Sequence, residues 1–304
     1  MAKKDAVGDG EPKRLEEIKR RVIIAMFSDD WLLERLVLKG GNALDLIHRI
    51  STRASRDLDF SIQGDFANEE LEEIKNRVEA SLKQTLGESE LEIFDITMKE
   101  VPEGLTADLS DFWGGYCVEF KVIERQKFQA HRGDLNAIRR YALNFGEGGS
   151  TKFSIDISKY EFVEGKEAHE LSGYRIFVYS PAMMVCEKLR AICQQMAEYG
   201  PVVKRNRPGG ARARDFVDIH TLVTCRSLAM TSKDNQVLLR HIFVAKRVPL
   251  ELLNRIANYR EFHAENFVAV KDTVKPGLEL QSFDFYFDFV LELVAQFDLR
   301  TDWE

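Results

Sequence analysis

The sequence predicts an α+β fold, with a mixed sheet and helices in the N-terminal part and helices alone in the C-terminal part. Three observations support this. Strand-like alternation and short apolar runs occur before residue 180, whereas helical spacing dominates after it. A strand pattern that stops at two glycines is followed by a helix and then a second strand, as in α/β units. The 304 residues can bury a sizeable core in one large domain or two ordinary ones.

The elements of the N-terminal part follow a polar, glycine-containing lead-in at 1–12, which we expect to be disordered. Helical spacing of apolar residues, short apolar runs and polar–apolar alternation define the elements that follow. The predicted elements are a helix at 13–27, a strand at 36–38, a helix at 42–49, a strand at 57–62, a charged amphipathic helix at 67–86, and strands at 91–98, 115–125, 152–158 and 174–179.

The C-terminal part begins with a helix-start signal at Ser180-Pro181. Further helices are predicted at 181–198, 211–226, 233–245, 249–258 and 281–298. We therefore expect an α/β domain over 13–180 and a helical domain over 181–304. The Arg/Pro/Gly stretch at 204–210 has helical patterns on both sides, so we interpret it as a loop within the second domain.

Composition excludes several classes of protein. Hydrophobic content of 44% and charged content of 31% are typical of a globular protein, and no apolar run has the length of a transmembrane helix. The charged N-terminus has no apolar segment behind it, so we expect a cytoplasmic protein without a membrane partner. The four cysteines form no zinc-type spacing and are expected to be reduced thiols, mostly buried. A net charge of −7 argues against a protein that coats nucleic acid.

Asp57 and Asp59 are the first candidate catalytic residues. Residues two apart on a strand point to one face, so these carboxylates converge while Leu58 and Phe60 face the core. Two like charges so close are unfavourable unless a cation lies between them. Mg²⁺ accepts carboxylate and phosphate oxygens and would serve as that cation. An Asp-x-Asp pattern alone more often marks a solvated strand face, so the metal site depends on its surroundings.

Gly40 and Gly41 provide those surroundings. Glycines let a backbone approach a ligand closely, and the free amides of a helix N-terminus favour phosphate. A strand, a Gly-Gly turn, a helix and a strand that carries the two aspartates would place a phosphate-binding turn beside the metal carboxylates. The alternative is an ordinary strand-to-helix turn.

Asp156 is the third candidate carboxylate. In the predicted strand at 152–158, Ile155 and Ile157 would face the core, and Asp156 would share the opposite face with two serines. A two-metal site needs a further carboxylate from a neighbouring strand, which Asp156 could supply. A solvent-facing aspartate is the alternative.

Four motifs follow one another along the chain. They are Lys39-Gly40-Gly41-Asn42-Ala43-Leu44, Ser55-Arg56-Asp57-Leu58-Asp59-Phe60, Glu187-Lys188-Leu189-Arg190-Ala191-Ile192 and Arg214-Asp215-Phe216-Val217-Asp218-Ile219. Together they closely resemble the nucleotidyltransferase toxins of the AbiEii/AbiGii type. The third is similar to the family's Lys-Leu-x-Ala-Leu helix and the fourth to its Arg-Asp-x-x-Asp-Leu helix. Agreement of several motifs in the family's order is far more specific than any one motif.

The resemblance implies a nucleotidyltransferase (polymerase β-like) mixed-sheet core with an α-helical C-terminal region. It also implies transfer of a nucleotide, or less often pyrophosphate, from an NTP to an acceptor, with Mg²⁺ or Mn²⁺ as cofactor. Members act as toxins in toxin–antitoxin or abortive-infection phage-defence systems, and some modify the acceptor end of tRNA. An RNA acceptor, such as a tRNA 3′ end, and a cognate antitoxin are therefore the expected partners.

The resemblance also assigns site residues. It implies metal binding by Asp57 and Asp59, phosphate contacts by the Gly40-Gly41-Asn42 turn and Ser55, a triphosphate contact by Lys188, and a further catalytic carboxylate at Asp215. The family usually has Gly-Gly-Thr in the turn. Asn42 replaces that threonine, which puts a hydroxyl contact there in doubt.

Lys188 and Asp215 can also be interpreted from their own surroundings. Lys188 lies on a largely apolar predicted helix, where a lysine extends either to solvent or to an anion such as a triphosphate. Asp215 and Asp218 are three residues apart on a helix and share a face beside Arg214. A structural Arg–Asp network is the alternative to a catalytic role, and so is a role in positioning Lys188 or the acceptor.

Other features remain open at the level of sequence. His48 and His220 lie on predicted helices and are interpreted as structural. The basic stretch 204–214 is either a solvated loop or an acceptor-RNA contact. Two other functions compete with nucleotidyl transfer. One is kinase-like phosphoryl transfer to a protein partner, and the other is a catalytically silent module that binds nucleotide or RNA.

Overall fold

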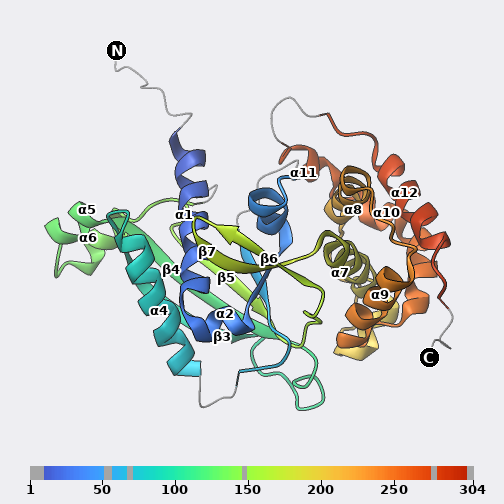
Figure 1. Ribbon diagram of the computed structural model, residues 1–304, viewed down its shortest axis with the longest axis horizontal. Helices are drawn as coiled ribbons and strands as arrows, with labels where there is room; N and C mark the ends of the chain where they lie inside the picture. The colour runs from blue at the N-terminus through green and yellow to red at the C-terminus, as the bar shows by residue number, and fades with distance from the viewer. Residues whose placement is uncertain (1–9, 51–56, 67–70, 146–148, 275–278, 300–304) are drawn as a thin grey trace.

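A seven-stranded mixed sheet forms the N-terminal part of the molecule, and helices form the C-terminal part (Figure 1). The computed structural model describes residues 10–50, 57–66, 71–145, 149–274 and 279–299. Within these residues the last strand ends at Tyr179 and the next helix begins at Pro181. The predicted α+β class and the change from strands to helices at residue 180 are both confirmed.

The strands and helices alternate irregularly along the N-terminal part. Its elements are α1 (Gly10–Ser28), α2 (Asp30–Arg35), β1 (Val37–Lys39), the short α3 (Gly40–Asn42), the π-helical turn η1 (Ala43–Ile47), β2 (Leu58–Ser61), α4 (Leu71–Gly87), β3 (Leu91–Val101), β4 (Gly115–Glu124), α5 (Arg125–Ala130), α6 (Leu135–Arg140), β5 (Phe153–Ser158), β6 (Lys166–Leu171) and β7 (Tyr174–Tyr179).

The C-terminal part contains helices of several lengths. They are α7 (Pro181–Gln194), the 3-10 helix η3 (Ala197–Val203), α8 (Ala213–Arg226), α9 (Lys233–Ala245), the 3-10 helix η4 (Leu250–Tyr259), α10 (Arg260–Ala264), α11 (Phe267–Lys271) and α12 (Phe283–Ala295).

The strand order of the sheet is β3-β4-β5-β2-β1-β7-β6, so the short strands β1 and β2, which come first in the chain, lie near its middle. β2 runs parallel to β5 and antiparallel to β1, and β1 runs parallel to β7. The central strands β1 and β2 are therefore fixed on both edges by backbone hydrogen bonds, which makes their side-chain positions well defined.

Alternation of side chains explains how the sheet presents both a core face and a polar face. Along β5, Phe153, Ile155 and Ile157 are buried, while the residues between them stay partly exposed. On the core side α1 packs against α4, and α4 packs against β3 (Figure 1). The polar residues of β5 consequently lie on a sheet face that is open to ligands.

Helix α7 joins the two parts of the chain. It begins as predicted, because Ser180 Oγ accepts a hydrogen bond from the Met183 amide at 3.3 Å and Pro181 fills the first turn. α7 packs against β7 on one side and against α8 and α9 on the other. It is therefore largely buried, and the charged side chains on it are held in fixed places.

Several features differ from the sequence prediction. β6 was not expected, because Lys166–Leu171 is mostly polar and lies at the sheet edge, where strands lack a strong apolar signal. The Gly-Gly pair was expected to precede a helix, but Gly40 and Gly41 form its first turn, and η1 ends at Ile47. Strand β3 also continues to Val101, three residues beyond its predicted end.

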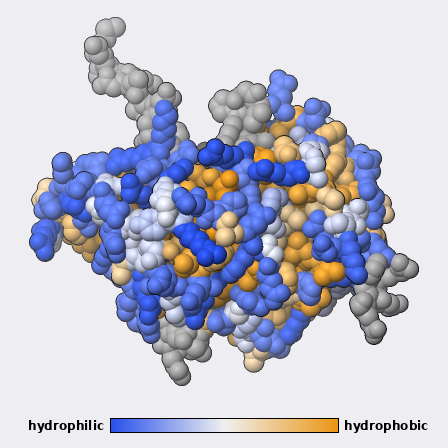
Figure 2. Space-filling view, viewed as in Figure 1, coloured by the Kyte–Doolittle hydropathy of each residue, from blue (hydrophilic) through white to orange (hydrophobic). Residues whose placement is uncertain are grey.

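The surface is mixed in character. Figure 2 shows hydrophilic residues over most of the face around α1 and α4, and more hydrophobic residues over the helical part. None of the described helices is long and apolar enough to cross a membrane. The four cysteines are free thiols, as expected, but half of them are buried and Cys225 is exposed.

Candidate active site

Three neighbouring strands place charged side chains in one row across the middle of the sheet. Lys39 on β1 lies opposite Asp59 on β2, and Asp59 lies beside Asp156 on β5. Residues paired across strands point to the same face, about 5 Å apart. Asp57 precedes β2 and is exposed. The structure therefore places Asp59 and Asp156 side by side and Asp57 near them, but the oxygens of these three carboxylates do not form a group within 4.8 Å of one another among the described residues, so metal binding by the three stays a prediction.

Electrostatics at Asp59 indicates that this cluster is short of positive charge. Burial, together with smaller contributions from the carboxylates of Glu187, Asp156 and Asp57, raises the pKa of Asp59 to about 7 against the lowering effect of Lys39. Burial also raises the pKa of Asp156. Among the residues that the structure describes, Asp59 has no hydrogen-bond or ion-pair partner. A polyvalent cation would remove this repulsion between carboxylates.

Gly40 allows this arrangement. Its φ of +71° lies in the left-handed region, which favours glycine, and a Cβ there would collide with Oδ2 of Asp59. The Gly-Gly turn therefore lies directly against a candidate metal ligand. The sequence predicts that this turn approaches the phosphates of a bound nucleotide. The structure shows that the turn lies close to the Asp59 side chain.

The structure describes Asn42, one of the predicted phosphate-contacting residues, but not Ser55. Asn42 is buried, and its Nδ2 donates to the backbone carbonyl of Asp57, so the side chain ties the turn to the start of β2. Gly41 is half-buried beside it. Ser55, predicted to contact phosphate, lies outside the described residues. Contacts of this turn with phosphate stay predictions.

Lys39 is a site residue that the sequence analysis did not identify. Its buried Nζ donates to Glu187 Oε1 at 2.7 Å and to Ser158 Oγ at 3.1 Å, and lies 3.5 Å from Glu161 Oε1. Burial would lower the pKa of Lys39, but Glu187 and Glu161 outweigh it and raise the pKa. A lysine at the end of a buried apolar run was the signal that could have revealed it.

Glu161 connects this lysine to the helices. Arg190 on α7 binds it with both terminal nitrogens, at 2.6 and 3.1 Å, and Lys246 Nζ lies 3.8 Å away. Burial would raise the pKa of Glu161, but Arg190, Lys39 and Lys246 lower it. Burial lowers the pKa of Lys246 to about 8. This buried network fixes α7 against the sheet and was also missed from sequence.

A pocket of about 460 Å³ lies between the sheet and the helices. Asp156 and Lys39 line its sheet side, together with Trp113 and the adjacent Gly114–Tyr116 segment. Its helical wall contains the residues Glu187, Arg190, Ala191, Gln194, Arg212 and Lys246. The pocket is large enough for a small-molecule ligand, and it combines carboxylates with four cationic side chains.

Lys188 and Asp215 lie together, in a different environment. Lys188 Nζ is buried between α7 and α8, at 2.7 Å from Asp218 Oδ2 and 3.0 Å from Asp215 Oδ1. The pocket-lining Arg212 reaches Asp215 Oδ2 at 3.4 Å. The pairing fits the alternative in which the aspartates position Lys188, whereas contact of Lys188 with a triphosphate stays a prediction.

The basic stretch 204–214 is partly used inside the protein. Lys204 pairs with Asp108 at 2.7 Å, and Arg205 donates to the carbonyl of Gln194 at 2.6 Å. Arg212, in contrast, lies at the pocket. Arg207 and Arg214 are also exposed, so an RNA contact by this stretch stays a prediction.

A scan against protein families matches residues 21–289 to the AbiEii nucleotidyl transferase toxins of type IV toxin–antitoxin systems. The chain belongs to the AbiEii family. As a member, it is a nucleotidyltransferase and a toxin of that system type, in agreement with the resemblance of its motifs.

Similar proteins of known structure are distant from this AbiEii member. A crystal structure from H. pylori, described as that of a nucleotidyltransferase, has 15% identity and a TM-score of 0.47, covering 95% of this chain and 96% of that one. An antigenic nucleotidyltransferase-like protein from Paracoccidioides brasiliensis has 11% identity and a TM-score of 0.35, covering 85% and 94%. A search of curated proteins finds no match.

Proposed function

We propose that this AbiEii toxin transfers a nucleotide from an NTP to an RNA acceptor, such as a tRNA 3′ end, with a divalent cation held by Asp57, Asp59 and Asp156. The observation that carries the proposal is the row of Lys39, Asp59 and Asp156 across three neighbouring strands, of which Lys39 and Asp156 line a pocket. The family supplies the reaction class, and the site supplies the residues.

The residues fit a divalent cation of the magnesium type. All three candidate ligands are carboxylates, the donors that Mg²⁺ and Mn²⁺ prefer. The raised pKa of Asp59, caused by burial and by the neighbouring carboxylates, supports the proposal that the cluster takes up a cation. When bound, such an ion would neutralise phosphate charge and orient the phosphates for attack.

The protein's own residues would hold and align the substrates. Glycine at positions 40 and 41 lets the phosphates approach the backbone amides. Arg190, Arg212 and Lys246 make the helical wall of the pocket attractive to the triphosphate. Such preorganised charge and positioning are the main sources of catalysis in phosphoryl and nucleotidyl transfer.

The chemical step is an in-line displacement at the α-phosphorus. The acceptor hydroxyl oxygen forms a bond to that phosphorus, the bond to the β-phosphate oxygen breaks, and pyrophosphate leaves. The hydroxyl proton passes to a carboxylate, for which Asp156 is the candidate because burial raises its pKa. Asp215 is the second candidate through its link to Arg212.

A radiolabel assay tests this function. The protein is incubated with Mg²⁺, total RNA and each α-labelled NTP, and the RNA is separated by electrophoresis. We expect label on RNA with the wild type and with Asp284→Asn, a matched control whose side chain is exposed beside Arg260. We expect none with Asp59→Ala. Label transfer that survives Asp59→Ala would refute the site.

Parallel reactions separate the competing functions. Transfer from γ-labelled but not α-labelled ATP to a protein would identify the kinase-like alternative. Failure to bind NTP with Mg²⁺ in calorimetry would identify a silent binding module. Because the family belongs to type IV toxin–antitoxin systems, we also propose an antitoxin as partner, which co-expression and a growth-rescue assay would reveal.

A further inference from the structure

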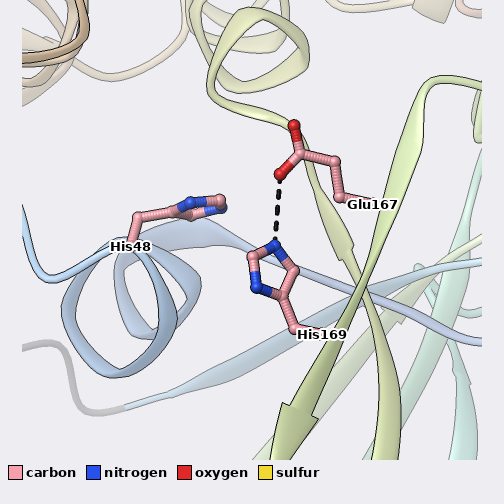
Figure 3. A group of neighbouring side chains, drawn as sticks. All are labelled: His48, Glu167 and His169. Atoms are coloured by element: carbon pink, nitrogen blue, oxygen red, sulfur yellow. Dashed lines mark hydrogen bonds and ion pairs between the residues drawn. The ribbon is translucent and has the colours of Figure 1, made fainter.

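A second group of potential metal ligands lies away from the carboxylate row. It consists of His48, directly after η1, and of Glu167 and His169 on the edge strand β6 (Figure 3). One ligand atom from each residue lies within 4.8 Å of the other two. Figure 3 shows the His48 ring pointing towards the other two side chains. Parts of the chain far apart in sequence thus present two imidazoles and a carboxylate to one point.

The pair on β6 already has a spacing close to that of metal ligands. Residues 167 and 169 are two apart on a strand and share a face. His169 Nε2 lies 3.1 Å from Glu167 Oε2. Two ligands at about 2.0–2.1 Å from a tetrahedral zinc lie about 3.3 Å apart. A zinc ion could therefore take the place of the proton that lies between His169 Nε2 and Glu167 Oε2, with little movement of these side chains.

His48 has the chemical form and the support of a metal ligand. It is buried, and its Nε2 lies 3.0 Å from the carbonyl oxygen of Tyr179. A carbonyl only accepts, so Nε2 carries the proton and Nδ1 keeps its lone pair. Metal-binding histidines generally have one nitrogen held in this way, which fixes the tautomer and the ring orientation.

The donor set selects a different metal from that of the carboxylate row. Two imidazole nitrogens and one carboxylate suit Zn²⁺, whereas Mg²⁺ prefers oxygen donors alone. Glu167 is exposed, so a water molecule can complete the tetrahedron. We propose that His48, Glu167 and His169 form a zinc site that is separate from the nucleotidyl-transfer site.

A metal at this position would act on the turn that carries the glycines. His48 lies at the end of η1, and η1 directly follows Gly40–Asn42 of α3. β6 is held to the rest of the sheet by β7 alone. The metal would link the end of η1 to this edge strand and would stabilise the folded form by binding.

Metal titration tests the site directly. Tag-free protein is treated with chelator, desalted and titrated with Zn²⁺ by calorimetry, in an Asp59→Asn background to weaken the carboxylate row. We expect one equivalent to bind, and a higher unfolding temperature with Zn²⁺. His169→Gln and Glu167→Gln should each weaken binding by at least about tenfold, since even losses of second-layer contacts weaken metal sites by about that much.

A matched variant and a spectroscopic probe make the result decisive. His241→Gln also removes an imidazole from the protein, an exposed one stacked on Phe162, and should leave Zn²⁺ affinity unchanged. Co²⁺ should give the intense visible bands of a tetrahedral site in the Asp59→Asn protein, and lose them in His169→Gln. His169 and Glu167 lie on an edge strand, so circular dichroism should show that their variants fold. Equal Zn²⁺ affinity in the Asp59→Asn background and in its His169→Gln derivative would overturn the proposal, as would a Co²⁺ spectrum without tetrahedral bands.

Discussion

Two pairs of aspartates, each of which contains a candidate catalytic residue, differ in how their charge is balanced. Asp59 and Asp156 lie on strands beside other carboxylates, and their pKa values are raised. Asp215 and Asp218 lie on a helix, and both bind Lys188 within 3.0 Å. The first set keeps its charge excess and so attracts a ligand, whereas the second is neutralised inside the protein. Aspartates are thus available to bind a cation on the sheet, whereas on α8 they stabilise the buried Lys188.

Removing the lysine should have the largest effect on stability. Lys188→Met removes the cation that both buried carboxylates bind and leaves Arg212 beside Asp215 alone, which costs about 3–5 kcal/mol of unfolding free energy. Denaturant titration measures this loss. Lys83→Met, at an exposed ion pair with Glu79, is the matched control and should cost less than about 1 kcal/mol.

A further variant separates support from catalysis at Lys188. Adding Asp215→Asn and Asp218→Asn to Lys188→Met removes the uncompensated charge and should recover much of the stability. If the triple variant is stable and still inactive, a role for this cluster beyond stability is supported. Unchanged stability of Lys188→Met itself would contradict the description of the cluster as support.

Asp59→Asn should show the opposite pattern. We expect transfer activity to fall by a factor on the order of 10²–10³, because the variant would hold the divalent cation that neutralises the reacting phosphates less well. Stability should stay the same or rise, because a repelled carboxylate is removed. Steady-state rates and thermal unfolding measure the two quantities, with Asp284→Asn as control. A large loss of stability would show that Asp59 is a structural residue.

Gly40→Ala tests the contact between the turn and Asp59. The left-handed backbone conformation alone costs about 1–2 kcal/mol. Gly104→Ala is the matched control, because Gly104 also has a φ of +71° but open space around it. The additional loss of unfolding free energy in Gly40→Ala, relative to Gly104→Ala, measures the collision with Asp59. Adding Asp59→Ala to Gly40→Ala should recover this additional loss. Equal losses in the two glycine variants would show that the collision is avoided.

The pH dependence of stability should differ between the wild type and Asp59→Asn. The pKa of Asp59 in the folded protein is about 7, above the 3.8 of a free aspartate, so the folded state holds the extra proton between these values. The wild type should therefore lose stability relative to the variant as pH rises from about 4 to about 7, by at most about 1.4 kcal/mol per pH unit. Saturating Mg²⁺ should weaken this slope. Parallel pH profiles in the absence of metal would refute the shift.

The sequence predicted the parts of the site whose signals are local. Strand alternation located β2 and β5, and the Ser180-Pro181 start located α7. The adjacency of Asp59 and Asp156 could not be derived from alternation, because it depends on which strands pair. Motif order suggested that adjacency only through the family resemblance.

The missed residues share a physical cause. The contacts of Lys39 with Glu161 and Glu187 join residues more than a hundred positions apart, and the contact of Arg190 with Glu161 joins residues about thirty positions apart. No local sequence pattern encodes such contacts. His169 was missed because β6 is a polar edge strand without a clear period. The contact of His48 with the Tyr179 carbonyl agrees with its predicted structural role, whereas its approach to β6 could not be derived from the sequence. Long-range pairing, rather than composition, therefore limited the prediction.

The contact between Gly40 and Asp59 also has an evolutionary consequence. A side chain at position 40 fits only if the carboxylate at position 59 is shortened or displaced. Loss of the aspartate would remove this collision but not the preference of a φ of +71° for glycine, so the glycine is under two separate constraints. Among relatives, a larger residue at position 40 would mark descendants that have given up the reaction and kept the fold.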